Sequence, residues 1–430
     1  MFLASREGPN VSCGFERFTL TAMLTIVLLF GGFVVQCYGR TAEKPKVRAI
    51  TAFIFLDRDN YKAQIFDALK MLGFAKSMFE QDGYEVQTIR ISTQPFTEYT
   101  VGMKREDILS FARDLDALAV QSNFHASIGP MFLRNGEEQQ QASLLAEILE
   151  NTKMLNASIV VARNGAIDWQ AIGAAGHVMK LLQENTKQGQ GNFRFSAIAN
   201  VPALTPFFPG SYDEGNGHQF TIALQSANLV QSAFAGAVDH VSAIRAFTES
   251  LNAQAKVVEN IGLAIAHQTG WEYMGIDLSP APLGDISIGG AIEDLTKQPF
   301  GASGTMTVAA EITAVLKAAL VKQVGYSGLM LPVLEDKRLA QRWSEGKISL
   351  DALLAYSAVC GTGLDVVPLP GEISEAGLAR IIGDVASLSA KWHKPLSARL
   401  LPVSGKKAGD RTDFDSPYMF NATIQSLISP

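Results

Sequence analysis

Residues 47–56 have the sequence VRAITAFIFL, and residues 84–91 have the sequence YEVQTIRI. Both stretches are rich in β-branched and aromatic residues, which predicts two strands, the second closed off in front by an Asp82-Gly83 turn. Between them, apolar residues recur at helical spacing, at Ile65, Leu69, Leu72 and Phe79. The order of strand, helix and strand predicts a βαβ unit with parallel strands.

The same alternation returns further along the chain. A strand is predicted at 158–162, a helix at 169–182 and a short strand at 195–199, and residues 223–266 are predicted to be mostly helical. Repeated crossovers predict an α/β fold with a mainly parallel sheet and helices outside it. Loops rich in Gly, Pro, Ser and Asp follow from Gly275, and we expect the functional site there, at the carboxyl ends of strands.

The amino-acid composition indicates what general class of protein this is. The chain has 430 residues, of which 47% are hydrophobic and 18% charged, and this balance is typical of a globular protein with a large core. A net charge of −6 without a long basic run argues against nucleic-acid binding. The three cysteines, Cys13, Cys37 and Cys360, are too few for a disulfide framework.

The N-terminal region contains an uncharged apolar segment from Phe18 to Gly39. Small residues near Cys37 suit cleavage of a signal peptide, whereas Arg17 and Arg40 at its ends suit a tilted membrane anchor. We therefore predict a leader or anchor with a linker at 1–45, and a single α/β domain at 46–430. With such a segment the protein is expected to be exported or anchored in a membrane. If the true start of the protein lies near Thr41, a cytoplasmic location is expected instead.

A first candidate loop contains Asp277 and Ser279 and leads through Gly289 and Gly290 into a helix predicted from Ala291. Free amides at a helix start bind anions. In the alternative interpretation, Asp277 and Asp285 only accept hydrogen bonds from backbone amides in a tight turn.

Cys360 follows a helix predicted from Leu350 to Val359, capped by Ser349 and ended by a left-handed Gly361. The negative end of a helix dipole raises the pKa of a thiol, which argues against a thiolate nucleophile. A neutral thiol is suited to hydrogen-atom donation or simply to packing.

Two further loops cover residues 322–328 and 394–410. The second brings Arg399, Lys406, Lys407 and Asp410 close together in sequence, and a basic loop flanked by glycines can hold a carboxylate or a phosphate. In the alternative interpretation, these charged residues only form a solvated surface. The six histidines have no spacing typical of a metal site.

Seven segments, in order, resemble the uncharacterised family called domain of unknown function 711. They are residues 47–51, 83–88, 205–209, 275–282, 325–332, 357–365 and 406–410. The resemblance implies a fold similar to that of glycyl radical enzymes such as pyruvate formate-lyase, a barrel of two parallel half-sheets with an inner finger loop. It places Cys360, Gly361, Gly363 and Asp365 in that loop. The Gln323-Val324-Gly325-Tyr326 string departs from the glycyl radical segment, so no such radical is expected.

Three functional hypotheses follow. The first is an enzyme acting on a small anionic metabolite, in which Arg399, Lys406 and Lys407 hold the anion and Asp277, Asp365 and Cys360 lie nearest the chemistry. The second is a non-catalytic small-molecule binding protein. The third is a magnesium or calcium site made by Asp277, Asp285, Asp365 and Asp410. No cofactor is assigned, and homo-oligomerisation stays open.

Overall fold

The computed structural model describes residues 44–133 and 136–427, which belong to one compact unit, Ala42–Pro430. The predicted leader or anchor at 18–39 lies outside the described residues. Within the part of the chain that is described, no helix has both the length and the apolar character needed to cross a bilayer.

Ten strands form one mixed sheet in the order β8-β7-β1-β2-β3-β4-β6-β10-β9, with β5 paired to β4. Their bounds are β1 Lys46–Ile54, β2 Val86–Thr93, β3 His125–Met131, β4 Leu155–Arg163, β5 Ala166–Ile167, β6 Phe195–Ala199, β7 Gln219–Gln225, β8 Glu272–Asp277, β9 Gly363–Pro370 and β10 Leu396–Val403. Five neighbours, β1, β2, β3, β4 and β6, are parallel. The pairs β7 with β8 and β9 with β10 are also parallel, and each joins the five through an antiparallel contact.

The two edge strands, β8 and β9, approach the same connecting segment, residues 322–332. Gln323 makes an isolated bridge to Ile276 of β8, and Pro332 makes one to Asp365 of β9. The sheet is therefore barrel-like, although no continuous ladder of hydrogen bonds closes it. This arrangement agrees with the predicted α/β barrel of parallel half-sheets.

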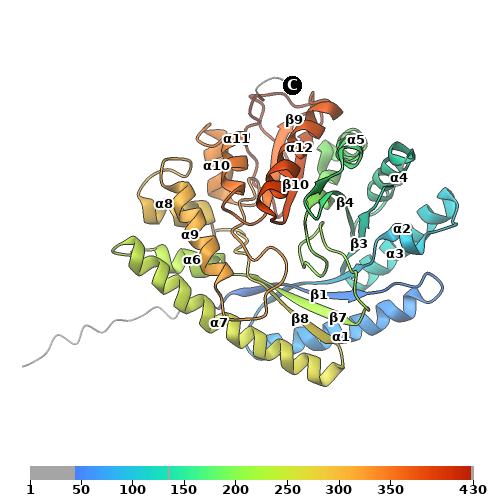
Figure 1. Ribbon diagram of the computed structural model, residues 1–430, viewed down its shortest axis with the longest axis horizontal. Helices are drawn as coiled ribbons and strands as arrows, with labels where there is room; N and C mark the ends of the chain where they lie inside the picture. Colours follow the sequence, from blue (N-terminus) through green and yellow to red (C-terminus); the bar gives the residue numbers. More distant parts are fainter. Residues whose placement is uncertain (1–43, 134–135, 428–430) are drawn as a thin grey trace, which may run out of the picture. The chain divides into compact units, whose positions relative to one another are not determined.

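Helices surround the strands on the outside (Figure 1). They are α1 Tyr61–Gln81, α2 Phe96–Tyr99, α3 Arg105–Ser122, α4 Glu138–Glu150, α5 Trp169–Asn185, α6 Ala227–Phe234, α7 His240–Thr269, α8 Ile288–Thr296, α9 Thr305–Lys317, α10 Lys337–Ser344, α11 Leu350–Ser357 and α12 Glu375–Trp392, with a short 3-10 segment η1 at Lys187–Arg194. Their apolar faces and the outer faces of the strands form the main core.

A separate small core lies on the other face of the strands. It is made by Ile198, Val201, Phe207, Tyr212, Ala281, Tyr326 and Met330. The loop between β6 and β7 supplies three of these residues, and its Ser211 is tied to Ser92 of β2 and Ser127 of β3 by hydrogen bonds. Residues 200–218 thus cover the inner face of the sheet, whereas Cys360 is buried in the main core.

The predicted βαβ unit is confirmed as β1, α1 and β2, and the predicted elements at 158–162, 169–182 and 195–199 correspond to β4, α5 and β6. The prediction that residues 223–266 are mostly helical is wrong at its start, because Ala223–Gln225 belong to β7. A short apolar run fits a strand and a helix equally well, and only its pairing with β1 decides between them.

Candidate ligand-binding site

A cavity of about 450 Å³ opens at the amino-terminal ends of the five parallel strands. His125 is the first residue of β3, Asn156 is the second of β4, and Phe193 lies in η1, two residues before β6 begins. The other lining residues are Arg48, Glu85, Val86, Gln87, Thr88, Arg90, Phe207, Phe208, Gln225, Ala281, Pro282, Leu283, Met330, Glu335, Asp365, Arg399 and Tyr418. Its volume suits a small metabolite.

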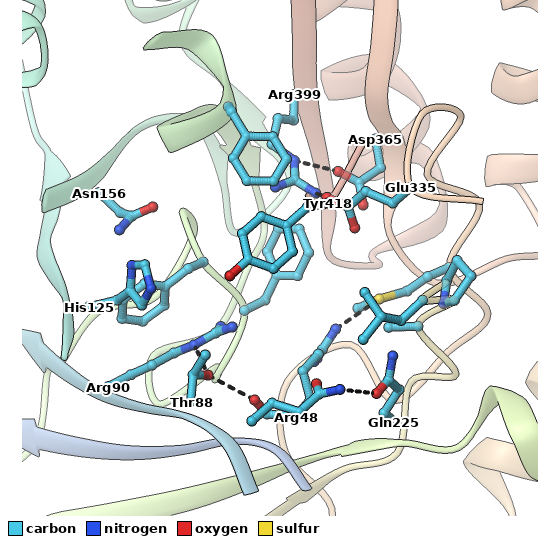
Figure 2. A pocket seen from close by; sticks show the side chains of 18 of the residues that line it. Arg48, Thr88, Arg90, His125, Asn156, Gln225, Glu335, Asp365, Arg399 and Tyr418 are labelled. Atoms are coloured by element: carbon cyan, nitrogen blue, oxygen red, sulfur yellow. Dashed lines mark hydrogen bonds and ion pairs between the residues drawn. The ribbon is translucent and has the colours of Figure 1, made fainter. Parts of the chain in front are cut away.

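Arg48 comes from β1 at a β-bulge, since the register with β7 shifts between Val47 and Ala49. Bulges redirect a side chain and are common beside functional sites. The guanidinium of Arg48 points into the cavity (Figure 2), where Nη1 contacts the Met330 sulfur at 3.3 Å. Its Nε and Nη2 are buried and have no hydrogen-bond partner among residues 44–133 and 136–427. Burial lowers the pKa of Arg48, although Asp277, Glu335 and Asp365 act against this.

Arg90 enters the same cavity from the neighbouring strand, β2. Its partners are neutral: Nε donates to Thr88 Oγ1 at 3.1 Å, Nη1 donates to the Pro206 carbonyl at 3.4 Å, and the guanidinium lies 4.9 Å from the Phe208 ring centre. Burial, together with the charges on Arg48 and Arg399, lowers the pKa of Arg90 to about 9. The cavity therefore disfavours the charge of Arg90, which Glu335 supports only from a distance.

Arg399 lies on the opposite wall, in β10, and pairs with two carboxylates. Its Nε donates to Asp365 Oδ1 at 2.7 Å, and its Nη2 donates to Glu335 Oε1 at 2.8 Å. The guanidinium also lies 4.7 Å from the Phe193 ring centre and 5.6 Å from that of Phe207. Burial opposes its charge, but Asp365 and Glu335 outweigh burial and raise the pKa of Arg399.

A second bulge positions Asp365. The register of β9 against β10 shifts after Asp365, and the extra residue is Val366 with a φ of +49°. A β-branched residue rarely adopts positive φ, and such strain is concentrated at functional sites. Bulges on β1 and β9 thus present Arg48 and Asp365 to the same cavity.

Two other titratable groups of the cavity have shifted pKa values. Burial, assisted by Arg90 and Arg194, lowers the pKa of His125 to about 4, so its ring is neutral at neutral pH. Burial raises the pKa of the Glu335 carboxyl, and Arg399 only partly offsets this. Glu335 keeps a side-chain exposure of 20%, and the hydrogen bond from Arg399 goes to its Oε1 atom.

Of the sequence-predicted residues, the structure brings Arg399 and Asp365 together in the cavity. Asp277 ends β8 and is fully buried, and its carboxylate accepts hydrogen bonds from the amides of Ser279 and Tyr326. Asp285 is fully exposed beside Lys337. Asp277 therefore agrees with the interpretation that it accepts hydrogen bonds from backbone amides. For Asp285 that interpretation is not confirmed, because its contact is with Lys337 at 3.9 Å.

The predicted anion site at the start of α8 is occupied by the protein itself. The amides of Ile288 and Gly289 donate to Asp336, and the amide of Gly290 donates to the capping Ser287. The helix begins at Ile288 rather than at the predicted Ala291. Its free amides are satisfied internally because a carboxylate remote in sequence packs against them.

Cys360 and the loop that follows it are packed into the main core of the protein. Burial raises the pKa of the Cys360 thiol, in agreement with the predicted neutral form. Lys394 donates to carbonyls at the end of α11, including that of Ser357 at 2.9 Å. Gly361 is not left-handed, and that prediction is wrong; it is glycine because a Cβ would lie 2.6 Å from Gly328. Gly363 has a φ of +93° and lies against Ser397.

Lys406, Lys407 and Asp410 lie in a turn after β10 and do not line the cavity. Lys406 pairs with Asp413 at 3.3 Å, and Asp410 accepts a hydrogen bond from the amide of Lys407 at 2.8 Å. In residues 44–133 and 136–427, no group of three or more His, Cys, Asp or Glu side chains is arranged to hold a metal ion.

Sequence reasoning missed Arg48, Arg90, His125 and Glu335. For Arg48 and Arg90 the available signal was an arginine inside each of two predicted strands, because burying an arginine in a sheet is costly unless it is paired or binds something. These strands lie in the first half of the chain, whereas the glycine-rich loops drew attention to the second half.

Comparison with known proteins identifies the family. The model of the family described as Uncharacterised ACR (DUF711) matches residues 41–416. The chain belongs to this family. Relatives named UPF0210 protein occur in Pyrobaculum arsenaticum, at 29% identity over 80% of this chain and 79% of the relative, and in Methanococcoides burtonii, at 27% identity over 87% and 88%. A relative of the same name in Syntrophobacter fumaroxidans is 29% identical, with 77% of each chain covered.

Proposed function

We propose that the protein binds a small anionic metabolite in this cavity, with Arg48 and Arg90 holding the anionic group. The observation that carries the proposal is the guanidinium of Arg48, whose Nε and Nη2 are buried and unpaired. Leaving a buried polar group without a partner costs about 1–3 kcal/mol, and more for a charged one. A bound anion would satisfy these donors.

Two further features support the proposal. Arg90 comes from the adjacent strand and has only neutral partners, so two guanidiniums converge on one space. Arginine binds carboxylates and phosphates through several donors at once. The aromatic rings of Phe207, Phe208 and Tyr418 also line the cavity and would contact the uncharged part of the metabolite.

The test is saturable binding of inorganic phosphate, followed through the melting temperature. Phosphate should raise the melting temperature of the wild-type protein, because a ligand that prefers the native state stabilises it. Arg48→Met and Arg90→Met should each lose this rise. Arg113→Met removes an exposed arginine of α3 and serves as the control, which should keep it. An equal rise in all four proteins would refute the proposal.

We also infer that residues 18–39 act as a leader or an anchor, since they carry no charge and follow Arg6 and Arg17. Fractionation of cells expressing the full chain, beside cells expressing a chain that starts at Thr41, tests this. Export or membrane association should require the segment.

A further inference from the structure

The cavity also indicates the chemical class of the ligand. We propose that the ligand carries a compact dianionic head group, as a phosphate monoester does, and that Glu335 takes up a proton when this group binds between Arg48 and Arg90. This inference rests on the proposed function and specifies it further.

The first step is a count of the charges that face the cavity. Arg48, Arg90 and Arg399 contribute three positive charges, and Asp365 and Glu335 contribute two negative ones. With Glu335 ionised, one positive charge stays unbalanced. With Glu335 protonated, the excess is two, which matches a dianion.

Other charges near the cavity are outside this count. Glu85 lines the cavity but pairs with Lys46 at 2.7 Å. Asp277 does not line the cavity and accepts hydrogen bonds from backbone amides, and its negative charge acts on both Arg48 and Lys317. His125 is neutral because its pKa is lowered to about 4 by burial and by Arg90 and Arg194.

The second step is the position of Glu335. It lines the cavity, and among the described residues its side chain accepts a hydrogen bond from Arg399, through Oε1. Its charge is coupled to those of Arg399, Asp365 and Arg48, and it also acts on Arg90 across the cavity (Figure 2). Burial already raises the pKa of this carboxyl, and a second anion nearby would raise it further. The protonated carboxyl can then donate a hydrogen bond to the ligand.

The third step is the choice between one dianionic group and two separate carboxylates. Arg90 pairs with Thr51 across the two parallel strands, so its backbone lies three residues further along than that of Arg48. The two side chains nevertheless turn into the same cavity, and after burial itself the charge on Arg48 is the largest effect that lowers the pKa of Arg90. Two cations that converge on one space favour charges that are concentrated on a single group. Phosphate offers three acceptor oxygens in a compact shape.

The experiment compares methyl phosphate with methyl sulfate by isothermal titration calorimetry at pH 8. The two probes have the same shape, but the phosphate ester is a dianion at this pH because its second pKa is about 6. Methyl phosphate should bind about tenfold or more tightly, and measurements in buffers of different ionisation enthalpy should show uptake of close to one proton. Methyl sulfate should bind without proton uptake.

Glu335→Gln keeps the shape of the side chain but has no carboxyl to titrate. It should still bind methyl phosphate, without proton uptake, and an unchanged uptake would overturn the role of Glu335. Equal affinity for both probes, or tighter binding of malonate than of methyl phosphate, would overturn the ligand class. If Arg48→Met still abolishes binding in those cases, the proposed function stands. If Arg48→Met binds every probe as the wild type does, the proposed function fails instead.

Discussion

The arginines on the two walls of the cavity differ in their ion pairing and in the direction of their pKa shifts. On the wall made by β9 and β10, Arg399 is held by Asp365 and Glu335, and its pKa is raised although burial opposes its charge. On the wall made by β1 and β2, Arg48 and Arg90 form no ion pair with a carboxylate of the described residues, and burial lowers their pKa values. This difference indicates that Arg399 stabilises the fold, whereas Arg48 and Arg90 are available to bind an anionic ligand.

The largest effect on stability is expected for Arg399→Met. This change leaves Asp365 and Glu335 without their cation, and breaking a buried ion pair from one side costs about 3–5 kcal/mol. The free energy of unfolding, measured by urea denaturation, should fall by that amount.

The matched control for this variant is Arg163→Met. Arg163 also pairs with a carboxylate, that of Glu214 at 2.6 Å, but its side chain is 51% exposed. An exposed ion pair is worth only about 0–1 kcal/mol. If the two variants lose equal stability, Arg399 has no special structural role.

A smaller effect concerns pH and Glu335. Its folded-state pKa is raised above the ordinary 4.5, mainly by burial, so the protonated form is favoured in the folded protein. This contribution to stability is complete below pH 4.5 and is lost as the pH rises towards the raised value. Glu335→Gln should therefore remove part of the loss of stability seen in the wild type over that pH range. Parallel stability curves for the two proteins would contradict the shift.

The smallest effect on stability is expected for Arg90→Met. The variant loses two hydrogen bonds to neutral groups and the contact with Phe208, but it also removes a buried charge without a counter-ion. The lost contacts destabilise the protein and the removed charge stabilises it. We therefore expect the free energy of unfolding, measured by urea denaturation, to change by no more than about 1 kcal/mol. A loss as large as that of Arg399→Met would mean that both walls are structural.

Local patterns predicted the elements of the fold but not the site. β1, α1 and β2 follow from periodicity within residues 47–91 of the sequence. The bulge that directs Arg48 depends on pairing with β7, which is remote in sequence. Asp336, which accepts hydrogen bonds from the amides at the start of α8, lies 47 residues from Gly289. Such contacts between distant segments are set by the folded sheet, so no local motif reveals them.

The most direct test of the central claim is the stability of Arg48→Met with and without inorganic phosphate. The account predicts that in phosphate-free buffer this variant is at least as stable as the wild type, because it removes a buried charge that lacks a partner. It also predicts that phosphate stabilises only the wild type. A variant that is markedly less stable in phosphate-free buffer, yet is stabilised by phosphate as much as the wild type, would contradict it.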